Sequence, residues 1–369
     1  MKKIIYIVSE INKALAFEWV AQYLDKEKFQ LSFVLLGDTN TAISNELKRL
    51  GIRVTEIQLG SKPALIFAFF RVLFHLKRVK PDIVHTHLFY ANMIGLTTAW
   101  ILRIPKRVVT RHHAMIHYDE HPQGIKWDKY INHIATHIVA ISLNTKEILK
   151  FLDKADERKI RLIHHGFDLA YFSDINLTRV QALKRKYGLE GSYPVVGVIS
   201  RYLLLKGIEY IIDAFNLLRR DFAGAQLVLA NASGSYSETI KKKLKNLPNG
   251  SYVEIEFEND LAALYQIFNI YVHTPKDSKS ESFGQTYVEA LASGIPSIFT
   301  LSGVAPEFIV HENNALVVPF QDSNAIYISM QRILSEAKLR ETLSSNGRLS
   351  ANLFSLECMM NSLTQLYEE

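Results

Sequence analysis

Short apolar segments alternate with helical patterns along this chain, in two separate series, and this alternation restricts the fold more than any other feature. In the first series the helix-like stretches are 18–24, 42–50 and 64–77. The strand candidates around them are rich in valine and isoleucine and cover residues 3–8, 31–36, 53–58, 83–86, 107–110, 137–140 and 161–164. Strands that are apolar on both faces are typical of a parallel sheet, and strand–helix alternation predicts that helices cover it.

The pattern breaks after His164-His165-Gly166-Phe167-Asp168, and a polar stretch follows before it restarts. The second series predicts a helix over 208–219 and strands over 195–199, 226–229, 253–257, 270–273, 297–300 and 316–318. We therefore predict an α/β protein with two Rossmann-like, doubly wound parallel-sheet domains that face each other across a cleft. The 369 residues are enough for two domains. The expected domains are 1–172 and 173–350, with a C-terminal helix over 351–369 that packs back on the first domain.

The segment 278–300, SKSESFGQTYVEALASGIPSIFT, carries the most informative polar residues. It predicts a loop followed by a helix over 286–293, which Gly294 and Pro296 end. Gly284 at the helix start lets a ligand approach bare backbone N–H groups, and these groups favour phosphate. The segment therefore predicts a phosphate-binding helix start.

Two glutamates, Glu281 and Glu289, flank that helix start. The side chain of Glu289 points back toward the helix start, where a carboxylate can accept hydrogen bonds from both hydroxyls of a ribose. Glu281 lies in the preceding loop, within reach of a sugar beyond the phosphates. The alternative is that both acids only stabilise the helix start electrostatically.

The second polar feature is the loop that follows the predicted strand 195–199. It carries Arg201 and Lys206 before the next helix. Two cations at the carboxyl end of a strand can clamp a diphosphate, although a solvated loop also carries such charges.

Taken together, the two features resemble retaining glycosyltransferases of family 4, which have the B-type fold of two Rossmann-like domains. The resemblance rests on an arginine, four residues and Lys-Gly after a strand, and on Glu-x7-Glu with Phe-Gly inside and Glu-Ala-x-Ala-x-Gly-x-Pro trailing. It extends to Lys80-Pro81-Asp82-Ile83-Val84-His85-Thr86-His87, Thr110-Arg111-His112, Gly166-Phe167-Asp168 and Glu307. It thus covers nearly the whole chain.

The resemblance implies a role for each matching residue. Arg201 and Lys206 would bind the donor diphosphate, Glu289 the ribose, and His112 would approach the donor sugar from the N-terminal domain. The residues that would surround the transferred sugar and the phosphates are Glu281, Phe283, Gly284 and Gln285.

Three places depart from the family pattern. Paired glycines are usual after the first strand, where this chain has Ser9-Glu10-Ile11-Asn12-Lys13-Ala14. Ala230-Asn231-Ala232-Ser233-Gly234 stands where Gly-x-Gly is usual, and Ser302-Gly303 replaces a second glycine pair. These departures concern backbone contacts to acceptor and phosphate, and they leave the Glu-x7-Glu block intact.

The implied activity is the transfer of a hexose or N-acetylhexosamine, with retention, from a nucleotide-diphosphate sugar to a glycan or lipid-linked acceptor. UDP is the default nucleotide by the resemblance, and the implied process is cell-surface polysaccharide synthesis. Fixed cations and N–H dipoles would neutralise the leaving diphosphate, so we expect no metal and no other cofactor.

Thirteen histidines allow a different hypothesis. His85 and His87 end a predicted strand with their side chains on one face, and His112, His113, His117 and His121 follow the next strand. Such a cluster is typical of metal-dependent hydrolases. A nucleotide-sugar epimerase and a non-catalytic sugar-nucleotide sensor are also compatible with a chain of this architecture.

Charge is distributed unevenly. Residues 1–175 hold 25 lysines and arginines against 17 acids, a net charge of +8, whereas the remaining residues hold 18 against 20. The basic aromatic stretch 63–80 predicts either an interfacial helix on an anionic membrane or a core-packed helix with a basic end. No nucleic-acid-binding signature accompanies this charge.

The remaining features concern the compartment. Cys358 is the only cysteine, which excludes an intrachain disulfide and favours a reducing compartment. Glu10 interrupts the first apolar run, so a first strand is favoured over a signal peptide. No apolar run is long enough to span a membrane. We expect a cytoplasmic protein, peripheral on the inner face of the cell membrane.

Overall fold

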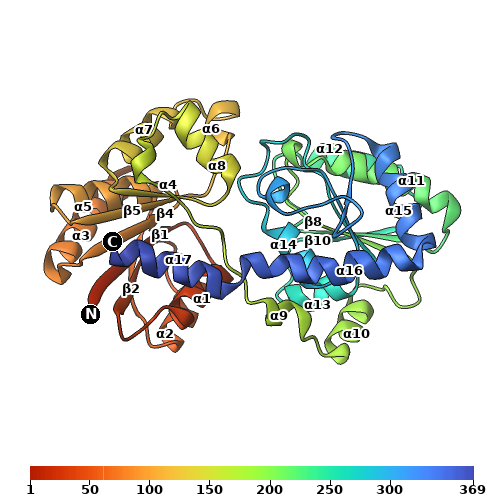
Figure 1. Ribbon diagram of the computed structural model, residues 1–369, viewed down its shortest axis with the longest axis horizontal. Coiled ribbons are helices and arrows are strands. Elements are labelled where there is room, and N and C mark those ends of the chain that lie inside the picture. The colour runs from red at the N-terminus through yellow and green to blue at the C-terminus, as the bar shows by residue number, and fades with distance from the viewer. Residues whose placement is uncertain (61) are drawn as a thin grey trace. The chain divides into compact units, whose positions relative to one another are not determined.

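The computed structural model describes residues 1–60 and 62–369, with the side chains of residues 62 and 63 left out. The chain forms two compact units (Figure 1). The first unit comprises Met1–Phe167 and Leu356–Glu369, and the second comprises Asp168–Ser355. The chain therefore leaves the first unit once and returns to it for its last segment.

The first unit is built on a seven-stranded parallel sheet with the order β3-β2-β1-β4-β5-β6-β7. Its strands are β1 (Lys2–Ser9), β2 (Phe29–Gly37), β3 (Arg53–Gln58), β4 (Ile83–His87), β5 (Lys106–Arg111), β6 (His137–Ala140) and β7 (Ile160–Leu162). Its helices are α1 (Leu15–Tyr23), α2 (Ala42–Arg49), α3 (Lys62–Val79), α4 (Phe89–Ala91), α5 (Thr97–Ile101), α6 (Ile116–Asp119), α7 (Gly124–Ile134), α8 (Leu143–Glu147) and α17 (Leu356–Glu368), with π-helices η1 (Asn92–Leu96) and η2 (Ile148–Leu152) and the 3-10 helix η3 (Glu157–Lys159).

The second unit repeats this plan with a six-stranded parallel sheet in the order β10-β9-β8-β11-β12-β13. Its strands are β8 (Val195–Ile199), β9 (Gln226–Ala230), β10 (Tyr252–Ile255), β11 (Ile270–His273), β12 (Ser297–Phe299) and β13 (Leu316–Val317). Its helices are α9 (Leu169–Ser173), α10 (Leu177–Lys186), α11 (Ile208–Asp221), α12 (Ser237–Leu244), α13 (Leu261–Gln266), α14 (Gln285–Ala292), α15 (Ser323–Ser335) and α16 (Ala337–Ala351), with 3-10 turns η4 (Leu204–Lys206), η5 (Ala305–Glu307) and η6 (Asn352–Phe354).

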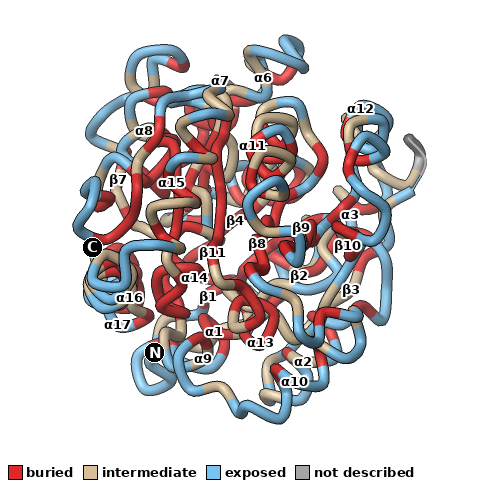
Figure 2. The backbone as a smooth tube through the Cα atoms, turned by 90° about the vertical axis from the view of Figure 1, so that its right-hand side faces the viewer, coloured by how far each residue is buried: buried red, intermediate tan, exposed pale blue. Residues whose placement is uncertain are grey.

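Two doubly wound parallel sheets confirm the predicted fold class. In each sheet the strand order reverses beside the first strand, between β1 and β4 and between β8 and β11. Figure 2 shows these central strands as buried chain, with exposed segments such as α10 and α12 outside them. Ligands of such sheets bind beyond the carboxyl ends of the strands at these points of reversal.

Two edge strands end two residues earlier at their carboxyl ends than expected. β7 ends at Leu162 rather than at residue 164, and β10 ends at Ile255 rather than at residue 257. The neighbouring strands supply the reason, because β6 ends opposite Leu162 and β9 ends opposite Ile255. Beyond these points an edge strand has no backbone left to pair with.

The first boundary between the units follows Phe167, earlier than the expected residue 172. The second boundary follows Ser355, later than the expected residue 350. Asp168 caps α9 through Tyr171 N, and Phe172 packs against Tyr265 of the second unit. Phe354 packs against Phe283 and Phe308. The residues on both sides of the expected boundaries therefore belong to the core of the second unit.

Helix α17 completes the first unit on the face of the sheet that carries the side chain of Tyr6. It lies beside α1 and buries Met359, Leu363, Leu366 and Tyr367 (Figure 1). The opposite face of β1 carries Ile5 and Ile7, which belong to a core cluster with residues of α3 and α5. Both faces of the sheet are thus covered, which explains why its central strands are apolar throughout.

Candidate active site

The loop after β8 lies at the point of strand reversal in the second unit. It carries Arg201, which is exposed, and Lys206, which is partly buried. Gly207 follows with φ +63°, and a Cβ there would lie 2.3 Å from the backbone oxygen of Thr274. Only glycine lets this loop approach the end of β11 so closely. The Lys-Gly pair of the sequence thereby places Lys206 beside β11.

Glu281 is the partner of Lys206. Its Oε1 lies 2.5 Å from Lys206 Nζ and 3.0 Å from His273 Nε2, and its backbone N–H donates to Ser302 Oγ at 3.0 Å. Burial opposes the charged carboxylate, but the Lys206 ammonium and His273 outweigh it and hold the pKa of Glu281 at about 2. Burial also lowers the pKa of His273. The site thus contains a buried, ionised carboxylate next to a cation.

Helix α14 begins at Gln285, four residues after Glu281. Its N-cap is Gly284, with φ +84° and no side-chain hydrogen bond to the first turn. A Cβ on Gly303 would lie 2.6 Å from the backbone oxygen of Phe283, so glycine is required where the next loop closes on this turn. An uncapped helix start favours an anion through its N–H groups and its dipole.

Glu289 lies within α14 and is 8% exposed. Tyr265 OH donates to its Oε2 at 2.8 Å. Burial, only partly offset by this hydrogen bond, raises the pKa of Glu289 to about 7. The two glutamates of the motif therefore differ in charge state near neutral pH, although the sequence presents them alike.

The other predicted donor-binding residues differ in their exposure. The side chain of Phe283 is buried against Phe354, at a ring distance of 5.7 Å, so its ring is not open to a ligand. Gln285 is exposed on the first turn of α14. The sequence interpretation missed His273 and Tyr265 and named Ser302 only as a departure from a glycine pair of the family. The only signal for His273 is its position at the end of a strand.

His112 belongs to the first unit, where it lies beyond β5. Its Nε2 lies 3.0 Å from Nδ1 of His87, which ends the neighbouring strand β4. Burial, together with other histidines nearby, lowers the pKa of both imidazoles. Both rings are therefore neutral near pH 7.

His85 has a protein partner on each ring nitrogen. Its Nδ1 lies 2.7 Å from Tyr367 OH, and its Nε2 lies 2.7 Å from Thr110 Oγ1. Burial lowers its pKa to about 3. Neither ring nitrogen of His85 is available to an ion. The hypothesis that His85 and His87 together bind a metal is therefore wrong for His85.

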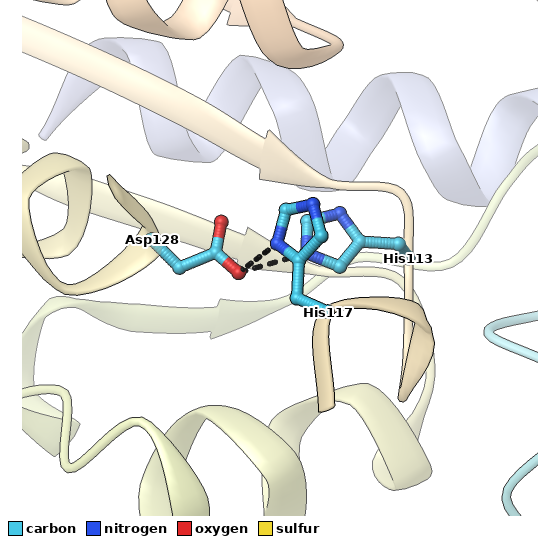
Figure 3. Close-up of side chains that lie close together, drawn as sticks. All are labelled: His113, His117 and Asp128. Atoms are coloured by element: carbon cyan, nitrogen blue, oxygen red, sulfur yellow. Dashed lines mark hydrogen bonds and ion pairs between the residues drawn. The ribbon is translucent and has the colours of Figure 1, made fainter. Parts of the chain in front are cut away.

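The remaining histidines of the predicted metal cluster differ in their surroundings. His121 is exposed, whereas His113 and His117 converge on one carboxylate oxygen of Asp128 (Figure 3). The potential ligand atoms of these three residues lie within 4.8 Å of one another. Arg111 Nη1, however, lies 2.7 Å from both His113 Nε2 and Asp128 Oδ2. A guanidinium in this position repels a divalent ion.

Two family models match the chain. The one described as "Glycosyltransferase Family 4" matches residues 20–171, and the one described as "Glycosyl transferases group 1" matches residues 180–350. The matches therefore cover most of both units.

Two relatives are similar over most of their length. A capsular polysaccharide biosynthesis glycosyltransferase, CapM, of Staphylococcus aureus is 26% identical over 305 residues, which are 80% of this chain and 78% of that protein. An alpha-monoglucosyldiacylglycerol synthase of Acholeplasma laidlawii is 24% identical over 310 residues, which are 79% and 76% of the two chains.

Two solved structures share the fold over their whole length. Anabaena Alr3699/HepE in complex with UDP and glucose has a TM-score of 0.85 at 17% identity and covers 100% of both chains. A glycosyltransferase from Rickettsia africae ESF-5 has a TM-score of 0.83 at 22% identity and covers 100% of this chain and 98% of its own.

Proposed function

The chain belongs to the family 4 glycosyltransferases, and from this premise we propose that it transfers a hexose or N-acetylhexosamine from a UDP-sugar with retention. The acceptor is a glycan or a lipid-linked sugar in cell-surface polysaccharide synthesis. One observation carries the proposal, namely that Lys206, Glu281 and the uncapped start of α14 meet at the point of strand reversal in the second unit.

Each part of this arrangement has a task in the proposed reaction. The transfer leaves negative charge on a diphosphate, and Lys206 with the N–H groups of α14 would stabilise that charge without a metal. Arg201, in the same loop as Lys206, would add a second cation. The ionised carboxylate of Glu281 would accept hydrogen bonds from the donor sugar, and Glu289 would accept the ribose hydroxyls.

Names of similar proteins support the donor and the process. The S. aureus relative is a capsular polysaccharide glycosyltransferase, and the Anabaena structure holds UDP and glucose. These names favour a transferase over the hydrolase, the epimerase and the non-catalytic sensor.

A donor panel tests the proposal directly. Purified protein incubated with UDP-, GDP- and ADP-sugars should release nucleotide diphosphate from at least one donor, and EDTA should leave the rate unchanged. NMR of the product would give its anomeric configuration. No release from any donor would contradict the proposal, and activity that EDTA abolishes and zinc or manganese restores would contradict its metal independence.

We predict that Glu289 makes donor binding depend on pH. Since the pKa of Glu289 is about 7 in the free protein, its carboxyl is mostly protonated below pH 7 and must ionise to accept both ribose hydroxyls. UDP-glucose affinity should therefore rise about tenfold from pH 6 to pH 8. A UDP-sugar is the appropriate probe, because its doubly esterified diphosphate does not titrate in this range.

Two glutamate variants provide the controls for this measurement. Glu289→Gln should bind about 10- to 100-fold more weakly at pH 8 and show no dependence on pH. Glu281→Gln should keep the pH dependence and mainly lose turnover. Calorimetric titration would measure the affinities, and an unchanged pH profile in Glu289→Gln would refute the assignment.

The exposed side chains of helix α3 are relevant to where the acceptor comes from. The core-packed alternative holds for one face only, where Ala68, Val72 and Leu76 are buried. The exposed fractions on the other face are large: Ile66 64%, Phe67 63%, Phe70 49% and Phe74 64%. Among the residues of the helix whose side chains the structure describes, the exposed cations are Arg71, Lys77 and Arg78. Among the residues placed by the structure, no helix combines the length and hydropathy that crossing a bilayer requires.

We propose that this face of α3 rests on an anionic membrane, where it meets a lipid-linked acceptor at the cytoplasmic surface. Apolar side chains rimmed by cations are typical of interfacial helices, and each cation near anionic lipid contributes about 1 kcal/mol. The net charge of +8 over residues 1–175 has the sign that such a surface requires.

Vesicle co-sedimentation tests this face. We predict binding to anionic vesicles, weaker binding at high salt, and a loss of about 100-fold in affinity in Arg71→Gln/Lys77→Gln/Arg78→Gln. The matched control is Lys241→Gln/Lys242→Gln/Lys245→Gln, which removes three exposed charges of the second unit and should bind normally. Absence of vesicle binding at low salt would exclude the membrane proposal.

A further inference from the structure

Three tyrosines of the second unit interact with the carboxyl group of Glu289. They are Tyr265 of α13, Tyr271 of β11 and Tyr171 of α9. Tyr265 makes a direct contact, because its hydroxyl donates to Oε2 of Glu289 at 2.8 Å. Among the residues that the structure describes, no lysine, arginine or histidine forms an ion pair with this carboxyl.

The partner of Glu289 is therefore of a different kind from that of Glu281. Glu281 lies beside the Lys206 ammonium, whereas Glu289 accepts from a neutral phenol. A hydrogen bond from a neutral donor favours the ionised carboxylate less than a cation does. The charge of Glu289 can consequently respond to a ligand that brings further hydroxyl donors.

The phenol of Tyr265 keeps its proton and can only donate in this pair when the carboxyl is ionised. Burial, together with the neighbouring Glu289 carboxyl, raises the pKa of Tyr265 well above its usual value. The hydroxyl is thus a permanent donor to the carboxylate across the physiological pH range.

The ring of Tyr265 is fixed in place by its neighbours. It is fully buried, with ring centroids of Tyr271 at 5.4 Å and of Phe172 and Phe268 at 6.1 Å. The helix that carries it is also anchored, since its N-cap Asp260 accepts from Arg179 Nε of α10 at 2.8 Å. The hydroxyl therefore has a defined position relative to α14.

We infer that Tyr265 is a positioning residue for donor binding, because its hydroxyl holds Oε2 of Glu289 and favours the ionised form of that carboxylate. An ionised carboxylate has about four lone-pair sites. Tyr265 occupies one of them, and the others are left for the two ribose hydroxyls. The link to the ribose rests on the proposed transferase function.

Carboxyl ¹³C NMR of protein labelled at glutamate tests the pair without any ligand. The resonance that is missing from Glu289→Gln assigns Glu289. Burial raises the pKa of Glu289 to about 7 and the Tyr265 hydrogen bond opposes that rise, so Tyr265→Phe should move the midpoint about one pH unit higher. Tyr265→Met, which also lacks a donor, should move it in the same direction. An unchanged midpoint in both variants would overturn the inference.

Tyr287→Phe is the matched control. Tyr287 is also fully buried, lies two residues before Glu289 on α14, and donates from its hydroxyl to the backbone oxygen of Thr300 at 3.0 Å. Its replacement removes a buried hydrogen bond of the same unit without touching the carboxyl, so the midpoint of Glu289 should stay near 7. A shift as large as that of Tyr265→Phe would overturn the inference.

Calorimetric titration with UDP-glucose tests the consequence for binding. Tyr265→Phe should bind about fivefold more weakly at pH 7, and this deficit should shrink toward pH 9, where the carboxyl is ionised in both proteins. In the double variant Tyr265→Phe/Glu289→Gln the affinity should equal that of Glu289→Gln within about twofold, because the hydroxyl acts through the carboxylate. An equal deficit at every pH would indicate a general structural defect and overturn the inference.

This inference and the proposed function fail separately. A shifted midpoint in Tyr265→Phe, in a protein that releases nucleotide from no donor, would retain the pair of Tyr265 with Glu289 and exclude the transferase. Nucleotide release together with an unchanged midpoint would retain the transferase and overturn the role of Tyr265.

Discussion

Replacement of Lys206 by alanine should lower turnover about 10²–10³-fold, the usual effect of removing a group that stabilises developing charge. It should also lower the free energy of unfolding of the second unit by about 3–5 kcal/mol. The reason for the second effect is that Glu281 would remain buried and ionised, with its nearest cation gone. Stopped assays at saturating donor and urea denaturation would measure the two losses.

The double variant Lys206→Ala/Glu281→Gln separates the two roles of the lysine. It replaces the carboxylate that has lost its nearest cation, so stability should largely return, whereas turnover should stay low because the cation beside the diphosphate is missing. Lys242→Ala, an exposed lysine on α12 of the same unit, should change neither quantity. Recovery of turnover together with stability would show that Lys206 serves only as a structural partner of Glu281.

Replacement of Tyr367 by phenylalanine should destabilise the first unit by about 2–4 kcal/mol, although it removes a single oxygen. Tyr367 OH lies 2.5 Å from Tyr6 OH and 2.7 Å from His85 Nδ1, in a site where all three residues are buried. The variant would leave two buried polar groups without a partner, and each such group costs about 1–3 kcal/mol. Thermal and urea denaturation of the purified variant would measure the loss.

Two further variants make this measurement specific. Tyr23→Phe, at a 48% exposed position of α1, should have little effect. Tyr6→Phe/Tyr367→Phe should cost less than the sum of the single variants, because each hydroxyl is the partner of the other. Additive losses would show that the two hydroxyls do not depend on each other.

The central strands could be predicted from the sequence because burial on both faces requires continuous apolar runs, and β8 and β11 match their predicted bounds. The ends of β7 and β10 could not, because they depend on where a neighbouring strand stops. The buried face of helix α3 could not be predicted either. Its composition suits a buried helix and a surface helix equally, and only its packing against the sheet decides which face is covered.

At the candidate site, the sequence shows the spacing of Glu281 and Glu289, but it does not show that their environments differ. Lys206 is 75 positions from Glu281 along the chain, and only the register of β8 beside β11 brings them together. His273 has no motif of its own and joins the site through the same sheet, and the position of Ser302 in a family pattern did not indicate its hydrogen bond to Glu281. The buried orientation of Phe283 depends on Phe354, in a segment that the sequence assigns to a separate terminal helix.

The return of α17 to the first unit gives the two halves different orders of completion during synthesis. The second unit is continuous in sequence, from Asp168 to Ser355, and can fold as soon as it has left the ribosome. The first unit begins earlier but receives Tyr367, and with it the partner of His85, only after the whole second unit has been made. At about 5–20 residues per second, the part of the sheet face that α17 covers stays open for roughly 10–40 s. The half of the chain that is translated first is therefore the half that matures last.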